Sequence, residues 1–364
     1  MRPLTLAECV PILLRHRLIS SASLVGGQVV VEDTSSRNSN RRVSRQRGAH
    51  YLLKQSTGIS QDATVKREAQ VYQSLAQIPH FAPHLVRFFC YDSEEDVLIL
   101  EYLRDMNDLA RHFAEGGRIT ASVSHAIGSV LGLLHRIDAG QLGADVALPS
   151  DAPWILGLHR PPLRFLRDVS AGNLELIRVV QSTPTLCEKL DEMRAAWRPI
   201  ALIHMDVRWS NWLVAHQRAS KGASGIKLLD WETACIGDPR WDVGCALSDT
   251  LMWWALQAPE TGGEVSRRRV SGDATQAMHG AIRVFWRRYC ETARVEITER
   301  APFLHRSLQY AGARLIQSAY ERLQQAHNLD RFGVSLLQLS ANILQFPEAA
   351  VERLCGLDGT AHEF

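Results

Sequence analysis

The chain has 364 residues, of which 46% are hydrophobic and 22% charged, a composition typical of globular proteins. This length allows about two lobes with cores of their own and excludes a disordered tail protein. The 41 Lys and Arg residues nearly balance the 39 Asp and Glu residues, so no overall field marks the chain as a duplex-binding protein. Seven scattered cysteines without a C-x-x-C pair argue against a zinc site and a disulfide framework.

The first residues, MRPLTLAECVPILLRHRLI, predict an amphipathic helix. Glu8 interrupts the apolar stretch and no small-residue cleavage site follows, which argues against a signal peptide. No uncharged run approaches the roughly 18 apolar residues that a membrane-spanning helix needs. We therefore expect a protein of the cytoplasm, with no membrane partner.

The first hundred residues predict a small lobe of strands and one helix. Strands are expected over residues 24–32, 50–55, 85–91 and 97–102. The polar segment TSSRNSNRRVSRQRG, with five arginines and no acid, is expected to form a turn or loop between the first two strands. A helix is expected over residues 63–76, because its apolar residues recur on one helical face.

Beyond residue 105 the sequence pattern becomes helical. The clearest helix covers residues 122–136, and apolar periodicity continues from 275 to 355. Segments rich in Gly, Pro and Ser at 140–153 and 258–274 are expected to be loops. One β-rich island, residues 201–230, interrupts the helical pattern.

Two short apolar runs in this island, Trp212 to Ala215 and Ile226 to Leu229, flank a polar connection and should pair as an antiparallel hairpin. Asn211 precedes the first run and Asp230 follows the second, so pairing places them side by side. Asp206 lies five residues upstream of Asn211. Two carboxylates and an amide oxygen are ligands that suit Mg²⁺.

The spacing H-x-D-x-x-x-x-N, followed by apolar-apolar-D, matches the catalytic base and the two metal ligands of the kinase template. The alternative is that Asp206 and Asp230 cap turns beside a sheet, as single aspartates near strand ends often do. The joint pattern favours chemistry, because three residue types at defined offsets must coincide.

The amino-terminal lobe supplies an independent indication. Lys54 is the only lysine among the first 65 residues and ends the predicted strand YLLK. Glu68 follows on the next predicted helix, one turn before Tyr72, as expected of the glutamate that orients a phosphate-binding lysine. The alternative is an exposed lysine on an edge strand with a solvated glutamate, but the order and spacing favour the pair.

These motifs resemble the aminoglycoside phosphotransferase and choline kinase-like branch of the protein kinase-like fold. HMDVRWSNWLV is similar to that family's H-G-D-x-x-x-x-N-x-L segment, LLDWE to its I-D-[FW]-E segment and IGDPRWDVG to its G-D-P-x-x-D-[LV] continuation. The resemblance, over about residues 25–246, implies an α+β, two-lobed kinase. Its small β-rich nucleotide-binding lobe would cover residues 1–103. A large, mainly helical lobe, residues 104–364, would hold the catalytic loop, the metal site and the acceptor-binding helices.

The resemblance also implies a role for each matching residue of the second lobe. Asp206 would be the catalytic base of an ATP-dependent O-phosphotransferase, and Asn211 and Asp230 would bind Mg²⁺. His204 and Asp242 would support the catalytic loop. One departure is Met205, which stands where the family has glycine.

For ATP, the resemblance implies that Lys54 and Glu68 position the phosphates and that the backbone of Glu101 and Leu103, in ILEYL, contacts adenine. No G-x-G-x-x-G motif covers the phosphates, and SSRNSN stands in that place. Backbone amides and Arg or Asn side chains also bind phosphate. The expected contacts in this segment are Arg37, Asn38 and Asn40; the alternative is a solvated basic turn.

More loosely, SRNSN and the R-W-S-N loop resemble kinase-like proteins of peptide natural-product biosynthesis, of the lanthipeptide and thioamitide type. This resemblance implies Ser or Thr of a precursor peptide as the acceptor and a partner biosynthetic enzyme. The arginine-rich helical segments at 275–330 do not favour a polycationic drug over a neutral, anionic or peptidic acceptor. The hydroxyl acceptor is therefore either a small molecule or a precursor peptide.

Two other functions compete with a kinase. A pseudokinase or nucleotide-sensing protein would usually have lost Lys54, Asp206 or Asp230, and none is lost. A single-strand nucleic-acid binder that used the arginines of residues 37–47 would need interleaved aromatic residues, which this stretch lacks. The sequence therefore favours an active kinase without a nucleic-acid partner.

Overall fold

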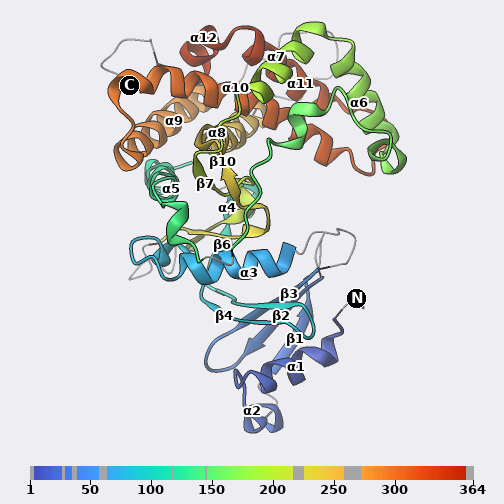
Figure 1. Ribbon diagram of the computed structural model, residues 1–364, viewed down its shortest axis with the longest axis vertical. Coiled ribbons are helices and arrows are strands. Elements are labelled where there is room, and N and C mark those ends of the chain that lie inside the picture. The colour runs from blue at the N-terminus through green and yellow to red at the C-terminus, as the bar shows by residue number, and fades with distance from the viewer. Residues whose placement is uncertain are drawn as a thin grey trace. The chain divides into compact units, whose positions relative to one another are not determined.

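The computed structural model describes residues 4–26, 29–34, 39–56, 64–115, 119–143, 146–215, 225–257 and 272–357. The chain forms two compact units and passes between them several times (Figure 1). Unit 1 comprises Met1–Glu115, Asp138–Leu148 and Ser210–Ala234, and unit 2 comprises Gly116–Ile137, Pro149–Trp209 and Cys235–Phe364. The predicted lobe boundary after residue 103 stays a prediction. In the part of the chain that the structure describes, no helix is long and apolar enough to cross a bilayer.

Unit 1 contains a five-stranded antiparallel sheet with the strand order β1-β2-β3-β5-β4. Its strands are β1 (Val29–Asp33), β2 (Ser39–Arg45), β3 (Tyr51–Gln55), β4 (Phe88–Asp92) and β5 (Val97–Glu101). Helix α3 (Thr64–Leu75) lies between β3 and β4 in the chain, where the sequence predicts a helix. The expected helix and the expected strands at 50–55, 85–91 and 97–102 are therefore confirmed. The strand expected over residues 24–32 is wrong at its start, because Leu24 and Val25 end helix α2 (Ser21–Val25) and β1 begins at Val29.

Strand β2 corrects the prediction of a loop between the first two strands. It pairs with β1 on one side and β3 on the other, so the two predicted strands are not direct partners. Arg41 is buried on the same face as Val43. Its guanidinium donates to the carbonyl oxygen of Leu4 at 3.0 Å and pairs with Asp33 at 2.8 Å. The alternation typical of a strand is hidden in the sequence, because an arginine occupies a buried position.

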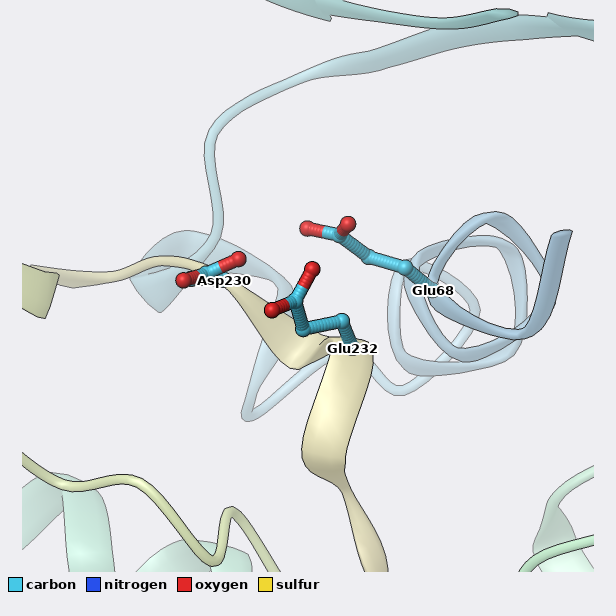
Figure 2. A group of neighbouring side chains, drawn as sticks. All are labelled: Glu68, Asp230 and Glu232. Carbon is cyan, nitrogen blue, oxygen red and sulfur yellow. The ribbon is translucent and has the colours of Figure 1, made fainter. Parts of the chain in front are cut away.

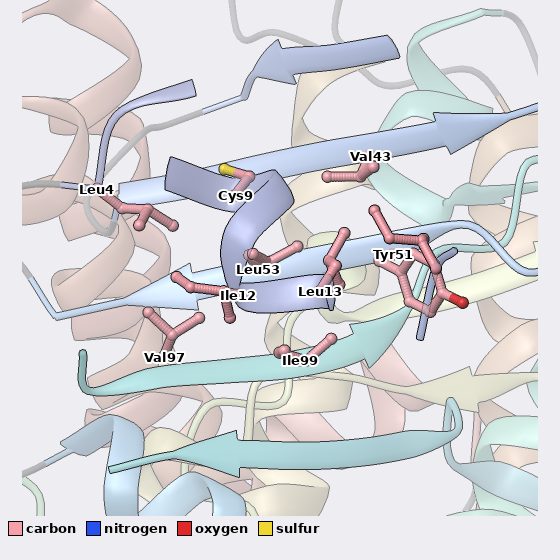
Figure 3. Close-up of a cluster of buried hydrophobic side chains, with 10 residues drawn as sticks. Leu4, Cys9, Ile12, Leu13, Val43, Tyr51, Leu53, Val97 and Ile99 are labelled. Atoms are coloured by element: carbon pink, nitrogen blue, oxygen red, sulfur yellow. The ribbon is translucent and has the colours of Figure 1, made fainter. Parts of the chain in front are cut away.

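Helix α1 (Leu6–Arg15), the predicted amphipathic helix, covers one face of this sheet (Figure 3). Its buried residues Ile12 and Leu13 belong to the same core cluster as Leu53 of β3. Successive side chains of a strand point to opposite faces. Lys54, the next residue of β3, therefore lies on the face away from α1.

A second sheet of unit 1 consists of β6 (Met106–Asp108), β8 (Trp212–Ala215) and β9 (Lys227–Leu228). The predicted hairpin is confirmed, since β8 and β9 pair antiparallel with Trp212 opposite Leu228. The amide of Leu229 donates to the carbonyl oxygen of Asn211 at 2.8 Å. The backbone pairing thus continues to the residue directly before Asp230.

Unit 2 is mainly helical. Its helices are α5 (Ala121–Leu134), α6 (Ala171–Gln181), α7 (Pro184–Ala195), α8 (Pro239–Leu256), α9 (Gly272–Ala293), α10 (Ile297–Arg322), α11 (Arg331–Gln345) and α12 (Pro347–Ala350). Strands β7 (Ala201–Ile203) and β10 (Cys235–Gly237) pair antiparallel. Helix α5 confirms the clearest helical prediction. Of the expected loop at 258–274, residues 258–271 lie outside the described residues, and residues 272–274 begin α9.

Helices α8 and α10 approach closely at Gly244. A Cβ atom on this glycine would lie 2.6 Å from the carbonyl oxygen of Ser307 and 2.8 Å from the Cβ atom of Tyr310. Backbone atoms of a packed helix do not move aside at low cost. The close approach matters because α8 and α10 both carry charged residues of the candidate site.

We expect Gly244→Ala to lower the free energy of unfolding by roughly 1–3 kcal/mol, because the added methyl group forces the two helices apart. Gly280→Ala is the matched control, since a Cβ atom there meets nothing within 4 Å. This control should raise stability by up to about 1 kcal/mol, the helix propensity gained from alanine. Urea denaturation measures both changes, and equal stabilities of the two variants would contradict the packing argument.

Candidate functional site

The Lys54 ammonium group on β3 lies among three carboxylates of unit 1. Its Nζ is 2.7 Å from Oε2 of Glu68, on α3, and 2.9 Å from Oε2 of Glu232. It also donates a hydrogen bond to Oδ1 of Asp230, which follows β9. The Lys54 side chain is 6% exposed and that of Glu68 is 1% exposed. Three segments far apart in the sequence thus meet at one buried cation.

The charges of this cluster depend on one another. Burial alone would lower the pKa of Lys54, but the three carboxylates raise it well above its usual value. Burial raises the pKa of Glu68, and the ammonium of Lys54 opposes that rise. Lys54 therefore stays charged, and its charge is what allows three carboxylates to lie together.

Figure 2 shows the carboxyl groups of Glu68, Asp230 and Glu232 gathered in one place. One ligand oxygen from each lies within 4.8 Å of the other two. Carboxylate oxygens are the ligands of hard cations such as Mg²⁺, so the donor set fits that ion. Glu232 is not among the predicted ligands. Its position in LLDWE, two residues after Asp230, could have indicated that it is a ligand. Asn211, a predicted ligand, is buried directly before β8, and its carbonyl oxygen accepts the amide of Leu229.

Asp206 belongs to unit 2 and is held by two arginines. Its Oδ1 accepts hydrogen bonds from Nε and Nη2 of Arg208 at 2.9 and 2.7 Å, and from Nη2 of Arg314 at 2.9 Å. Both guanidinium groups also reach Glu321, at 3.2 and 3.5 Å. Burial would raise the pKa of Asp206, but Arg314 and Arg208 bring it below its usual value. The carboxylate is therefore ionised at neutral pH.

Sequence reasoning missed Arg314 as a site residue and counted it among the arginines of segment 275–330. Its side chain is 2% exposed, on α10. Its position in the helical pattern could have indicated burial. The apolar residues Ala311, three positions before Arg314, and Leu315, directly after it, are both buried in α10. An arginine at a position that periodicity assigns to the core indicates a buried partner of opposite charge.

The loop that carries Asp206 is fixed by Asp242 on α8. Its two carboxylate oxygens accept the amides of His204 and Met205, at 2.7 and 2.9 Å. The indole of Trp241 donates to the carbonyl oxygen of Met205 at 2.8 Å. Met205 has a φ of 72°, where the family has glycine, and a side chain in this left-handed region costs about 1–2 kcal/mol. The contacts of Asp242 and Trp241 hold the loop in this conformation.

The remaining predicted nucleotide contacts belong to unit 1. Glu101 ends β5, its amide donates to the carbonyl oxygen of Arg87 at 2.8 Å, and Leu103 follows two residues later. Asn40 lies on β2, directly opposite Lys54. Arg37 and Asn38 lie outside the described residues, so their predicted phosphate contacts stay predictions.

The phosphotransferase enzyme family model matches residues 30–279. Among solved structures, the amicoumacin kinase hAmiN in complex with AMP-PNP, Ca²⁺ and Ami is similar, with 10% identity and a TM-score of 0.54 over 93% of this chain and 96% of that chain. A choline/ethanolamine kinase family protein from Mesorhizobium loti has 14% identity and a TM-score of 0.51 over 92% and 95%. LicA from Streptococcus pneumoniae in complex with AMP has 14% identity and a TM-score of 0.50 over 94% and 99%. A search of curated protein sequences found no match.

These matches confirm the expected family resemblance and the expected α+β, kinase-like fold. At identities of 10–14%, the solved structures establish the fold alone. The looser resemblance to kinase-like proteins of peptide pathways stays a prediction.

A further buried carboxyl group, Asp249 on α8, supports the loop after Asp206. It accepts the backbone amide of Trp209. Burial raises its pKa to about 6, although Arg314 and Arg208 oppose that rise. Sequence reasoning gave no indication of this residue.

This pKa predicts a pH dependence of stability. Between about pH 4 and pH 6 the folded protein binds more protons at Asp249 than the unfolded chain, so this group's contribution to stability falls as the pH rises. Asp249→Asn removes the titration and keeps an oxygen for the Trp209 amide. From pH 4 to pH 7, we expect the unfolding free energy of the wild type to fall relative to the variant by up to roughly 3 kcal/mol. Urea denaturation measures it, and a constant difference would contradict the raised pKa.

Proposed function

The chain belongs to the phosphotransferase enzyme family and is a kinase, and from this premise we propose that it transfers the γ-phosphoryl group of ATP to an acceptor hydroxyl group with Asp206 as the base. The observation that carries the proposal is the state of Asp206. Two arginines hold this carboxylate ionised, in a loop whose backbone Asp242 fixes. A carboxylate that is ionised at neutral pH and fixed in position can orient an acceptor hydroxyl group and accept its proton.

A base of low pKa suits this reaction. Phosphoryl transfer passes through a loose transition state, in which the acceptor oxygen has formed little of its new bond. The proton therefore does not need a strong base early in the reaction, and the position of the carboxylate matters more than its basicity. Arg208 and Arg314 supply that position by binding one oxygen of Asp206.

In the proposed donor site, Lys54 binds phosphate oxygens and Glu68 orients it. Asp230 and Glu232 would hold Mg²⁺ together with Asn211. When bound, Mg²⁺ neutralises charge on the transferring phosphoryl group. Lys54 would exchange carboxylate contacts for phosphate oxygens when the nucleotide enters. A nucleotide donor accords with the AMP-PNP and AMP of the similar kinase structures.

The family favours a small molecule as the acceptor. A precursor peptide and a partner biosynthetic enzyme stay predictions from the looser resemblance. A nucleotide-sensing protein without activity is the competing function. Retention of Lys54, Asp206 and Asp230, each with charged partners, favours catalysis over that alternative.

We expect Asp206→Asn to lower turnover at least 100-fold, the loss typical of a general base, and to leave ATP binding within about twofold. Asp191→Asn is the matched control, because Asp191 is another aspartate of unit 2 that pairs with an arginine, Arg160, but it lies on α7. It should keep wild-type turnover. Mass spectrometry of products from a panel of hydroxyl compounds and peptides, with ATP, measures the transfer. Wild-type turnover of Asp206→Asn would remove Asp206 from the role of base.

A further inference from the structure

A cavity of about 460 Å³ lies in unit 1, outside the cluster around Lys54. Its lining includes Val30, Glu32, Arg42, Ser44, Arg45 and Tyr102. This volume falls within the range of small-molecule sites, about 300–1,000 Å³. The cavity is therefore large enough for the base and sugar of a nucleotide.

Strand register places this cavity on the same face of the sheet as Lys54. Asn40 lies opposite Lys54, and Arg42 is two residues further along β2, so both point to that face. Glu32 of β1 lies opposite Arg42 and shares the face. Two residues along a strand span roughly 6–7 Å. A nucleotide whose phosphates reach Lys54 would thus bring its base toward Arg42.

The guanidinium group of Arg42 is fixed along its edges. Its Nε and Nη2 lie 2.9 and 2.7 Å from Oε2 of Glu32, and its Nη1 donates to the hydroxyl of Tyr102 at 2.9 Å. Its Cζ lies 5.2 Å from the centroid of the Tyr102 ring. All three nitrogens therefore have partners, and what remains for a ligand is a flat face of the guanidinium plane.

We propose that Arg42 binds the nucleobase of the phosphoryl donor by stacking its guanidinium face on the base, with Glu32 and Tyr102 fixing the guanidinium for this contact. The inference rests on the proposed nucleotide donor. A planar, delocalised cation stacks well on aromatic rings. A phosphate group would instead take the guanidinium edge, where it would have to displace Glu32. The arrangement therefore favours a base over a phosphate as the group that Arg42 contacts.

The test is the dissociation constant of ATP, measured by isothermal titration calorimetry for the wild type, Arg42→Lys, Arg42→Met and a control. Lysine keeps the charge and the pairing with Glu32 but has no flat face, whereas methionine loses both charge and plane. We expect both variants to bind ATP roughly tenfold more weakly, the loss of one stacking contact. Arg87→Met is the control, because Arg87 also lies over an aromatic ring, 4.8 Å from the centroid of Phe89, but does not line the cavity.

The control should bind ATP within about twofold of the wild type, and circular dichroism checks that each variant is folded. Wild-type affinity of Arg42→Lys would overturn the proposal, since charge alone would then suffice. Equal weakening of ATP binding in Arg42→Lys, Arg42→Met and the control Arg87→Met would also overturn the proposal. If Arg42→Met does not fold, Arg42→Lys decides the outcome. If the wild type binds no ATP, the proposed donor itself is refuted. If the wild type binds ATP and the Arg42 variants bind it equally well, only the role of Arg42 is refuted.

Discussion

The contact of the Lys54 ammonium group with three carboxylates is the interaction on which the site of unit 1 depends. It joins β3, α3 and the turn after β9. Without a cation, carboxylates within 4.8 Å of one another would repel and take up protons. Without the carboxylates, burial would lower the pKa of a lysine that is 6% exposed and favour its neutral form. Each half of the cluster therefore stabilises the charged form of the other.

In unit 2 the charges are reversed: a carboxylate lies between cations, whereas in unit 1 a cation lies among carboxylates. There the carboxylate of Asp206 is half-buried, and two guanidinium groups keep it ionised. Each unit thus pairs its central charged side chain with groups of the opposite charge. The strained backbone at Met205 belongs to this arrangement, because the carboxylate of Asp242 holds it in place.

The parts of the structure that the sequence predicts well depend on short-range spacing. The β8–β9 hairpin is confirmed because its two apolar runs flank a single turn-forming connection. Two residues whose partners are distant in the sequence, Arg314 and Asp249, were missed. The sequence alone suggests that Arg314 is a surface arginine, because its partner Asp206 lies 108 residues away in the chain. The buried Asp249 has no local sequence signal at all. Strand β2 was predicted as a loop because the polar side chain of Arg41 conceals its buried position.

The binding of Mn²⁺, followed by electron paramagnetic resonance, tests most directly whether Lys54 neutralises the carboxylates until a nucleotide arrives. Mn²⁺ is a paramagnetic substitute for Mg²⁺ at oxygen ligands. We expect weak binding of Mn²⁺ to the wild type without nucleotide. Binding to folded Lys54→Met, whose three carboxylates have lost their cation, should be at least tenfold tighter. Equal affinity of the two proteins for Mn²⁺ would contradict the account.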